Sequence, residues 1–295
     1  MTEFSHENPK AQKIEDFPNH FYTNPDPNID YIFGIDEAGR GPILGPMVYG
    51  IMVIPVSFQE ELKGMGVYDS KQLDASVRER IFSRIVDAGV IYFDTKSIGA
   101  LELSHAMQVD RVNLNKVALL ATQELVQRAL DKGFNLVSGY VDTVGDPLKW
   151  RKDLNEFHPL IDYTVESKAD ERYPVTGGAS IVAKVTRDKW MENYQQTMPG
   201  YSRLNMLPKC SGYASDERTV EMLKAAMHPL MGYPSDLVRT SWGGQGQDLE
   251  KLSGFKLSLP ETTGTDKNTI FSIFKPQCRL LKKRKEVLIH PLQTL

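Results

Sequence analysis

Glycine and proline residues crowd the segment from position 39 to 46, and this segment separates two short apolar runs. The first run, Tyr31-Ile32-Phe33-Gly34-Ile35, and the second, from Met47 to Val53, are rich in β-branched and aromatic side chains. Such runs, bounded by turn-forming residues, are typical of β-strands. Because parallel strands need a longer crossover, the short connection predicts an antiparallel pair.

Beyond these strands, the apolar residues follow two different periods. A spacing of three to four residues indicates amphipathic helices over residues 74–87, 110–131, 179–196 and 216–228. Short apolar or alternating runs indicate strands over residues 136–141 and 161–165. Strands interleaved with helices predict an α/β fold, a mixed sheet flanked by helices, rather than an all-α or all-β fold.

The two ends of the chain differ in composition from its centre. Residues 1–30 are polar and contain four prolines, which predicts a flexible leader. After Trp242-Gly243-Gly244 the periodic pattern weakens, and residues 261–268 form a polar, threonine-rich linker. We therefore expect a leader (1–30), one α/β domain (31–245) and a smaller helical C-terminal extension with a basic tail (246–295).

Composition also limits the classes of protein to which the chain can belong. Thirty-five Lys and Arg residues against 38 Asp and Glu give a net charge of -3, so a polyanion site would need local clusters of cations. Two cysteines, Cys210 and Cys278, exclude a disulfide framework and a cysteine-type zinc site. No apolar run has the length of a membrane span, and the N-terminus lacks the apolar core of a secretory signal. We expect a soluble, intracellular protein.

Acidic residues stand at the ends of three predicted strands. Asp36 and Glu37 follow the first apolar run, Asp142 closes the strand at 136–141, and Asp170 follows the strand at 161–165. In α/β sheets, ligands bind at the edge where strand ends converge. Carboxylates that meet there need cations between them to stay ionised, and ligand sets made of oxygen alone select Mg²⁺ or Mn²⁺.

Two such ions are the usual machinery of phosphodiester cleavage, in which one activates water and the other stabilises the leaving oxygen. The alternative is that the acids are ordinary turn and cap residues, because Asp is common after strands. Spacing alone leaves both interpretations open. Two adjacent acids, Asp36 and Glu37, beside a loop with two glycines favour the metal site for that pair.

The loop Gly39-Arg40-Gly41 also has two interpretations. It does not fit a dinucleotide-binding motif, because the third glycine falls one place late, at Gly45, and prolines at 42 and 46 oppose a helix start. A P-loop is excluded because no Gly-Lys-Ser/Thr follows. The glycines either let the backbone approach a ligand, with unusual backbone angles and with Arg40 available for a phosphate, or they form a tight turn.

Short motifs around these acids and glycines follow one another in a characteristic order. They are Asp36-Glu37-Ala38-Gly39-Arg40-Gly41-Pro42, Asp69-Ser70-Lys71, Tyr140-Val141-Asp142-Thr143-Val144-Gly145, Lys168-Ala169-Asp170, the segment from Ala179 to Asp188, Ser211-Gly212-Tyr213, Val238-Arg239 and Ser241-Trp242. Together they resemble the motifs of type 2 ribonuclease H, and in particular of its eukaryotic catalytic subunit. The resemblance spans residues 32 to 243, and the first motif alone is highly specific.

The resemblance implies a ribonuclease H-like fold and assigns a role to each matched residue. By this resemblance, the catalytic residues that bind two Mg²⁺ or Mn²⁺ ions are Asp36, Glu37, Asp142 and Asp170. The implied substrate-binding residues are Gly39, Arg40 and Gly41 at the ribose 2′-OH, Tyr213 at the neighbouring deoxyribose, and Lys71, Asn113 and Lys184 near the nucleic-acid backbone. The implied enzyme is a metal-dependent endonuclease that cuts the RNA strand of an RNA–DNA hybrid. It would also cut 5′ of a single ribonucleotide in duplex DNA, leaving 5′-phosphate and 3′-OH ends.

The resemblance further implies a heterotrimer with two non-catalytic subunits, to which the C-terminal region would help dock, and a place in the nucleus. The basic run Lys282-Lys283-Arg284-Lys285 suits nuclear import or contact with a polyanion, although such runs are also common as solvated tails. A non-catalytic nucleic-acid scaffold with the same fold is the alternative to an active nuclease. The intact set of acids favours the nuclease.

Overall fold

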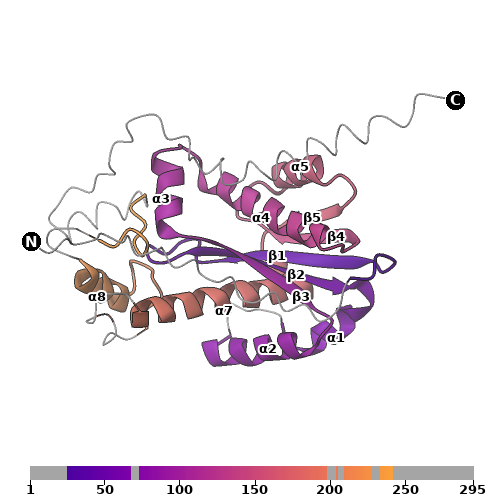
Figure 1. Ribbon diagram of the computed structural model, residues 1–295, viewed down its shortest axis with the longest axis horizontal. Coiled ribbons are helices and arrows are strands. Elements are labelled where there is room, and N and C mark those ends of the chain that lie inside the picture. The colour runs from indigo at the N-terminus through magenta and orange to yellow at the C-terminus, as the bar shows by residue number, and fades with distance from the viewer. Residues whose placement is uncertain (1–24, 68–72, 198–203, 205–208, 228–232, 242–295) are drawn as a thin grey trace, which may run out of the picture.

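The computed structural model describes residues 25–67, 73–197, 204, 209–227 and 233–241. In this part of the chain, helices cover both faces of a five-stranded sheet (Figure 1). The strands are β1 (Tyr31–Ala38), β2 (Met47–Pro55), β3 (Tyr92–Ile98), β4 (Leu136–Asp142) and β5 (Asp162–Glu166). The α-helices are α1 (Gln59–Gly64), α2 (Ala75–Asp87), α3 (Ala100–Gln108), α4 (Leu114–Asp131), α5 (Pro147–Phe157), α6 (Ala169–Arg172), α7 (Pro174–Thr197) and α8 (Glu217–Ala226), and a 3-10 turn spans Val56–Phe58.

The sheet is mixed, with strand order β3-β2-β1-β4-β5. Strands β1 and β2 form the predicted antiparallel pair, and β3 adds to β2 in the same antiparallel manner. Strands β4 and β5 run parallel to β1, with Ile35 opposite Val141. Parallel neighbours end at the same edge of a sheet, so the carboxyl ends of β1 and β4 lie side by side.

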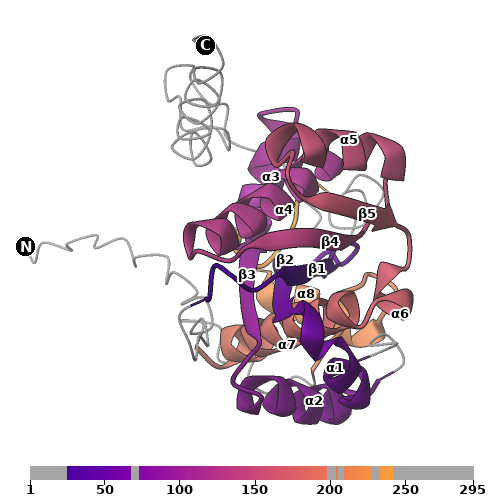
Figure 2. The same ribbon diagram turned by 90° about the vertical axis from the view of Figure 1, so that its right-hand side faces the viewer.

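Both faces of the central strand β1 are buried. Phe33 and Ile35 face the core shared with α4 and α5, and Ile32 faces the core shared with α2 and α7. Figure 2 shows the same layers from the side, with α4 and α5 on one face and α7 and α2 on the other. This double burial explains why the strand is a continuous apolar run rather than an alternating one.

Helix α7 approaches the sheet closely because small residues meet at the contact. A Cβ on Gly34 of β1 would overlap backbone atoms of Val175 and Thr176, and a Cβ on Gly50 of β2 would lie 2.6 Å from the carbonyl oxygen of Ala179. The helix begins at Pro174, five residues before the predicted start, since proline is favoured in a first helical turn.

Other boundaries and elements also differ from the sequence prediction. Helix α4 starts at Leu114 rather than near residue 110, because the Asn113 side chain caps it by accepting from Lys116 N at 2.9 Å. Strand β3 was not predicted. Asp94 in this strand is buried and forms an ion pair with Arg128 of α4 at 3.3 Å. A local sequence pattern does not reveal such pairing between distant residues.

The predicted leader up to residue 24 and the predicted extension from residue 246, with its basic tail, lie outside the described residues. No helix in the described ranges combines the length and the apolar character that crossing a bilayer requires.

The contact between α7 and the sheet generates a stability prediction. Gly34→Ala should lower the free energy of unfolding by about 2–4 kcal/mol, because the new methyl group meets backbone rather than a movable side chain. Gly64→Ala is the matched control, because a Cβ there meets nothing within 4 Å and the helix gains propensity. Urea unfolding of both variants checks this, and equal stabilities for the two would contradict the close packing.

Candidate active site

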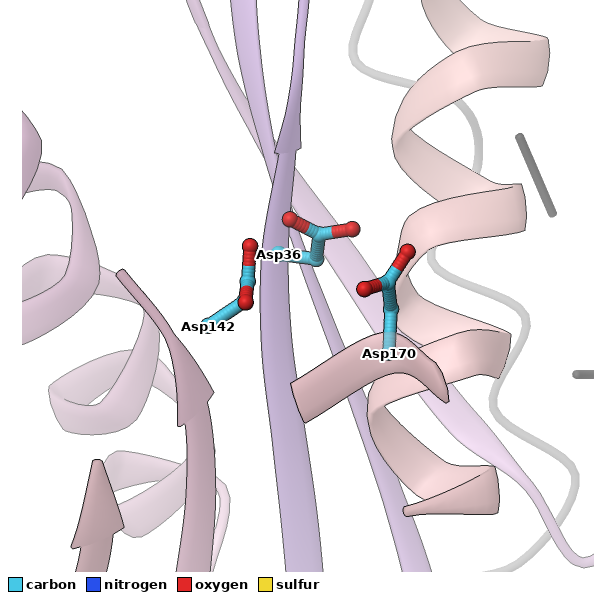
Figure 3. A group of neighbouring side chains, drawn as sticks. All are labelled: Asp36, Asp142 and Asp170. Carbon is cyan, nitrogen blue, oxygen red and sulfur yellow. The ribbon is translucent and has the colours of Figure 1, made fainter. Parts of the chain in front are cut away.

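Three aspartates from different elements meet at the carboxyl edge of β1 and β4. Asp36 lies on β1, Asp142 is the last residue of β4, and Asp170 lies in the short helix α6. One carboxylate oxygen of each lies within 4.8 Å of those of the other two, and all three side chains are buried (Figure 3). The predicted convergence of these acids is therefore present, although Asp170 reaches the site from a helix beyond the strand end.

The backbone beyond β5 turns sharply to bring Asp170 back to the other two aspartates. Lys168 adopts a left-handed conformation with φ 63°, which starts α6 directly after the strand connection. The backbone N–H of Ala169 then donates to Asp142 Oδ1 at 2.9 Å. This hydrogen bond fixes the Asp142 carboxylate and places Asp170, the next residue, beside it.

The electrostatics of the cluster favour an added cation. Burial raises the pKa of Asp36 well above its ordinary value of 3.8, and the charges of Glu37 and Asp142 raise it further. The Ser180 hydroxyl and the Lys184 ammonium act in the opposite direction without cancelling the rise. A divalent ion held by these oxygens would offset much of the repulsion between the carboxylates. A site whose protein ligands are carboxylate oxygens suits Mg²⁺ or Mn²⁺. The residues present therefore fit such an ion.

Glu37, the fourth predicted acid, adjoins this cluster without belonging to the group within 4.8 Å. Successive strand residues project to opposite faces, so Asp36 faces α7 while Glu37 stands opposite Tyr49 on the face toward α4. Its charge nevertheless raises the pKa of Asp36. The role of Glu37 as a metal ligand stays a prediction.

Two buried arginines fix the glycine loop, and the sequence motifs gave them no role. Arg239 is fully buried and donates to the carbonyl oxygens of Gly39 at 2.7 Å, Arg40 at 3.2 Å and Gly45 at 2.8 Å. Burial lowers its pKa to about 9, which leaves it protonated at neutral pH. Arg187 of α7 donates to Leu44 O at 3.1 Å in the same loop. An arginine within an apolar run, as at 237–239, is the signal that could have identified this role.

Tyr213 lies against the glycine loop. The residue is 47% exposed, and a Cβ on Gly41 would lie 3.0 Å from its ring. A backbone hydrogen bond from Ile43 N to Gly212 O, at 2.8 Å, joins the glycine loop to the loop that carries Tyr213. Left-handed backbone angles occur at Gly39 and not at Gly41, so the expectation that Gly41 needs unusual angles is wrong; the ring of Tyr213 is what restricts a side chain there.

The remaining predicted substrate-binding residues occupy different positions. Lys184 of α7 donates to Ser180 Oγ at 2.8 Å and affects the pKa of Asp36, so it lies beside the aspartates. Asn113 is exposed at the start of α4, where it caps the helix. Lys71 lies outside the described residues.

The chain resembles known proteins in sequence over most of its length. The sequence matches the family Ribonuclease HII over residues 33–244. One ribonuclease H2 subunit of Arabidopsis thaliana is 41% identical over 213 residues, covering 72% of this chain and 71% of that protein. The Homo sapiens protein of the same name is 39% identical, covering 75% of this chain and 73% of its own length.

A solved structure gives the same result for the fold. The crystal structure of the ribonuclease H2 from Pyrococcus horikoshii OT3 superposes with a TM-score of 0.61 at 30% sequence identity, covering 75% of this chain and 98% of that one. The motifs, the fold and the clustered aspartates thus lead to one conclusion: the chain belongs to the ribonuclease HII family and is a hydrolase with ribonuclease H activity on RNA–DNA hybrids.

Proposed function

We propose that the enzyme is an endonuclease that also cuts 5′ of single ribonucleotides embedded in duplex DNA, with two Mg²⁺ or Mn²⁺ ions and with 5′-phosphate and 3′-OH products. The observation that carries the proposal is the group of three buried aspartates within 4.8 Å of one another. A buried cluster of this kind is costly without a cation and is suited to phosphodiester chemistry with one.

In this proposal Asp36, Asp142 and Asp170 hold the ions, with Glu37 as a further ligand. When bound, the ions supply an activated water and stabilisation of the leaving oxygen. The protein contributes fixed positions: Asp142 is held by Ala169 N, and the Lys184 ammonium lies beside the cluster, where it favours the ionised form of Asp36. Lys184 would also meet the nucleic-acid backbone.

Recognition of the sugar is assigned to the glycine loop and to Tyr213. The 2′-OH is the group that distinguishes RNA from DNA at a given position. Backbone groups of Gly39, Arg40 and Gly41 would meet it, held still by Arg239, while the ring of Tyr213 stacks on the next sugar. A flat ring accepts deoxyribose and crowds a 2′-OH, so an RNA-to-DNA junction would be preferred. Lys71 and Asn113 would contact the backbone nearby.

We further propose that the chain works as the catalytic member of a heterotrimer in the nucleus. The relatives that it resembles are named as subunits, which supports an assembly.

Removal of residues 246–295 should reduce co-purification of two further chains and reduce nuclear retention. Full assembly and nuclear retention of the truncated chain would contradict this role of the extension.

Cleavage of a labelled duplex that contains one ribonucleotide tests the proposed activity directly. The full chain with Mg²⁺ should give one 5′ cut, EDTA should abolish it, and Asp142→Asn should lower kcat by about a thousandfold. The matched control is Asp162→Asn, which replaces an exposed acid at the start of β5 and should keep full turnover. Undiminished turnover by Asp142→Asn would contradict the metal site, and wild type that binds hybrid without cutting it would favour the non-catalytic scaffold.

The raised pKa of Asp36 generates a prediction about the metal-free protein. A carboxyl whose pKa is higher in the folded state contributes stability at low pH, and this contribution is lost as pH rises from about 3.8 through the folded pKa. Asp36→Asn removes that loss and should raise the Tm at pH 7 in EDTA, by about 2–4 °C for each 1 kcal/mol gained. The difference from wild type should shrink toward pH 4. Scanning calorimetry at both pH values checks this, and a lower Tm for Asp36→Asn at pH 7 would refute it.

Tyr213 should provide selectivity for the junction. Stacking on a nucleic-acid base contributes about 1–3 kcal/mol, and a sugar should give no more, so Tyr213→Ala should lose about ten- to a hundredfold in kcat/KM on the single-ribonucleotide duplex. The loss on a long hybrid should be smaller, and Tyr213→Phe should retain most of the activity because the ring remains. Equal losses on both substrates together with a lower Tm would show that Tyr213 only packs against the loop.

A further inference from the structure

The Arg40 side chain reaches the first turn of α4. Its Nη2 donates to Asn115 Oδ1 at 2.5 Å, although the two residues are 75 positions apart in the sequence. This hydrogen bond joins the glycine loop after β1 to the start of α4. No motif in the sequence pointed to Asn115.

Asn115 also lies close to the turn that follows Asp142. A Cβ on Gly145 would lie 3.6 Å from Asn115 Nδ2 and 3.0 Å from Nε1 of Trp150, a buried residue of α5. The turn is closed internally by a hydrogen bond from Gly145 N to Thr143 Oγ1 at 3.1 Å. Asn115 therefore stands between the loop that carries Arg40 and the turn that begins with a catalytic aspartate.

Buried Tyr49 lies against Arg40 from the side of the sheet. It is 1% exposed and stands opposite Glu37 in the β1–β2 register. Burial and the Glu37 charge raise the pKa of the Tyr49 phenol, while the charge and hydrogen bonding of the Arg40 guanidinium lower it. The guanidinium thus has a buried partner, Tyr49, as well as Asn115.

We propose that Asn115 is a positioning residue, which holds the Arg40 guanidinium between the glycine loop and the turn at residues 142–145 so that Arg40 meets a substrate phosphate in a fixed orientation. A guanidinium has five N–H donors, so the Asn115 contact leaves donors for a phosphate. An arginine that is already held loses less rotamer freedom on binding, which improves affinity. The inference rests on the proposed function, because it requires Arg40 to contact the substrate.

A double-mutant cycle on the full chain separates positioning from a direct or merely structural role. With an RNA–DNA hybrid and Mg²⁺, Asn115→Ala should lower kcat/KM by about 5- to 30-fold, mostly through KM, because the phosphate contact exists before the transition state. In the Arg40→Ala background the same substitution should change kcat/KM by less than about twofold. Asn135→Ala is the matched control, because it also removes a side-chain hydrogen bond, to Asp30 at 2.9 Å, but at the opposite end of β4.

The outcomes distinguish this inference from the proposed function. Wild type that cleaves neither hybrid nor the single-ribonucleotide duplex with metal, whether alone or together with its two proposed partner chains, would overturn the proposed function itself. Wild type that cleaves, with Asn115→Ala equally impaired in both backgrounds or unimpaired in the background that retains Arg40, would overturn the positioning role alone. Thermal unfolding should give Asn115→Ala and Asn135→Ala similar Tm values. A Tm for Asn115→Ala lower by much more than that of the control, with kcat and KM unchanged for the folded fraction, would show a structural role instead.

Discussion

Repulsion among three carboxylates that are held within 4.8 Å of one another, and away from water, is the constraint on which the architecture of this site depends. Burial and neighbouring charges raise the pKa of Asp36 even though Lys184 and Ser180 act against the rise. The surrounding structure must therefore hold the aspartates in place at a cost to stability. It does so by placing one on the central strand, one in a hydrogen bond with backbone, and one on a short helix packed against α7. A bound cation would attract all three carboxylates and so offset their mutual repulsion.

Topology and two buried arginines then organise the substrate side of the site. Because β4 runs parallel to β1, the ends of both strands share one edge, whereas a hairpin partner would place its end at the opposite edge. The loop after β1 is neither helix nor strand, yet Arg239 and Arg187 donate hydrogen bonds to its carbonyl oxygens. Under the proposed function, the loop would therefore meet a sugar without first being ordered. Arg187 also donates to Ser211 O at 3.4 Å, in the loop that carries Tyr213.

The sequence predicted those parts of the fold that depend on local pattern. The strands around Ile35 and Val141, and the helices at 74–87 and 216–228, follow from apolar periodicity and were found within a few residues. Strand β3 was missed because it buries Asp94 in an ion pair with Arg128, a contact between distant residues. The four acids could be selected by position, but the left-handed turn at Lys168 and the contact between Arg40 and Asn115 could not. Long-range contacts of this kind leave no period in the sequence.

Binding of Mn²⁺ to the full chain, measured by electron paramagnetic resonance at neutral pH, tests the central claim most directly. Asp170 is completely buried, so its carboxylate cannot be replaced by a mobile surface acid. The account predicts that wild type and the exposed-acid variant Asp162→Asn bind Mn²⁺ alike, and that Mg²⁺ competes. It predicts that Asp170→Asn binds at least about tenfold more weakly, because one charged oxygen ligand is lost. Equal binding by Asp170→Asn and wild type would contradict the account, because the three buried aspartates would then not form the metal site.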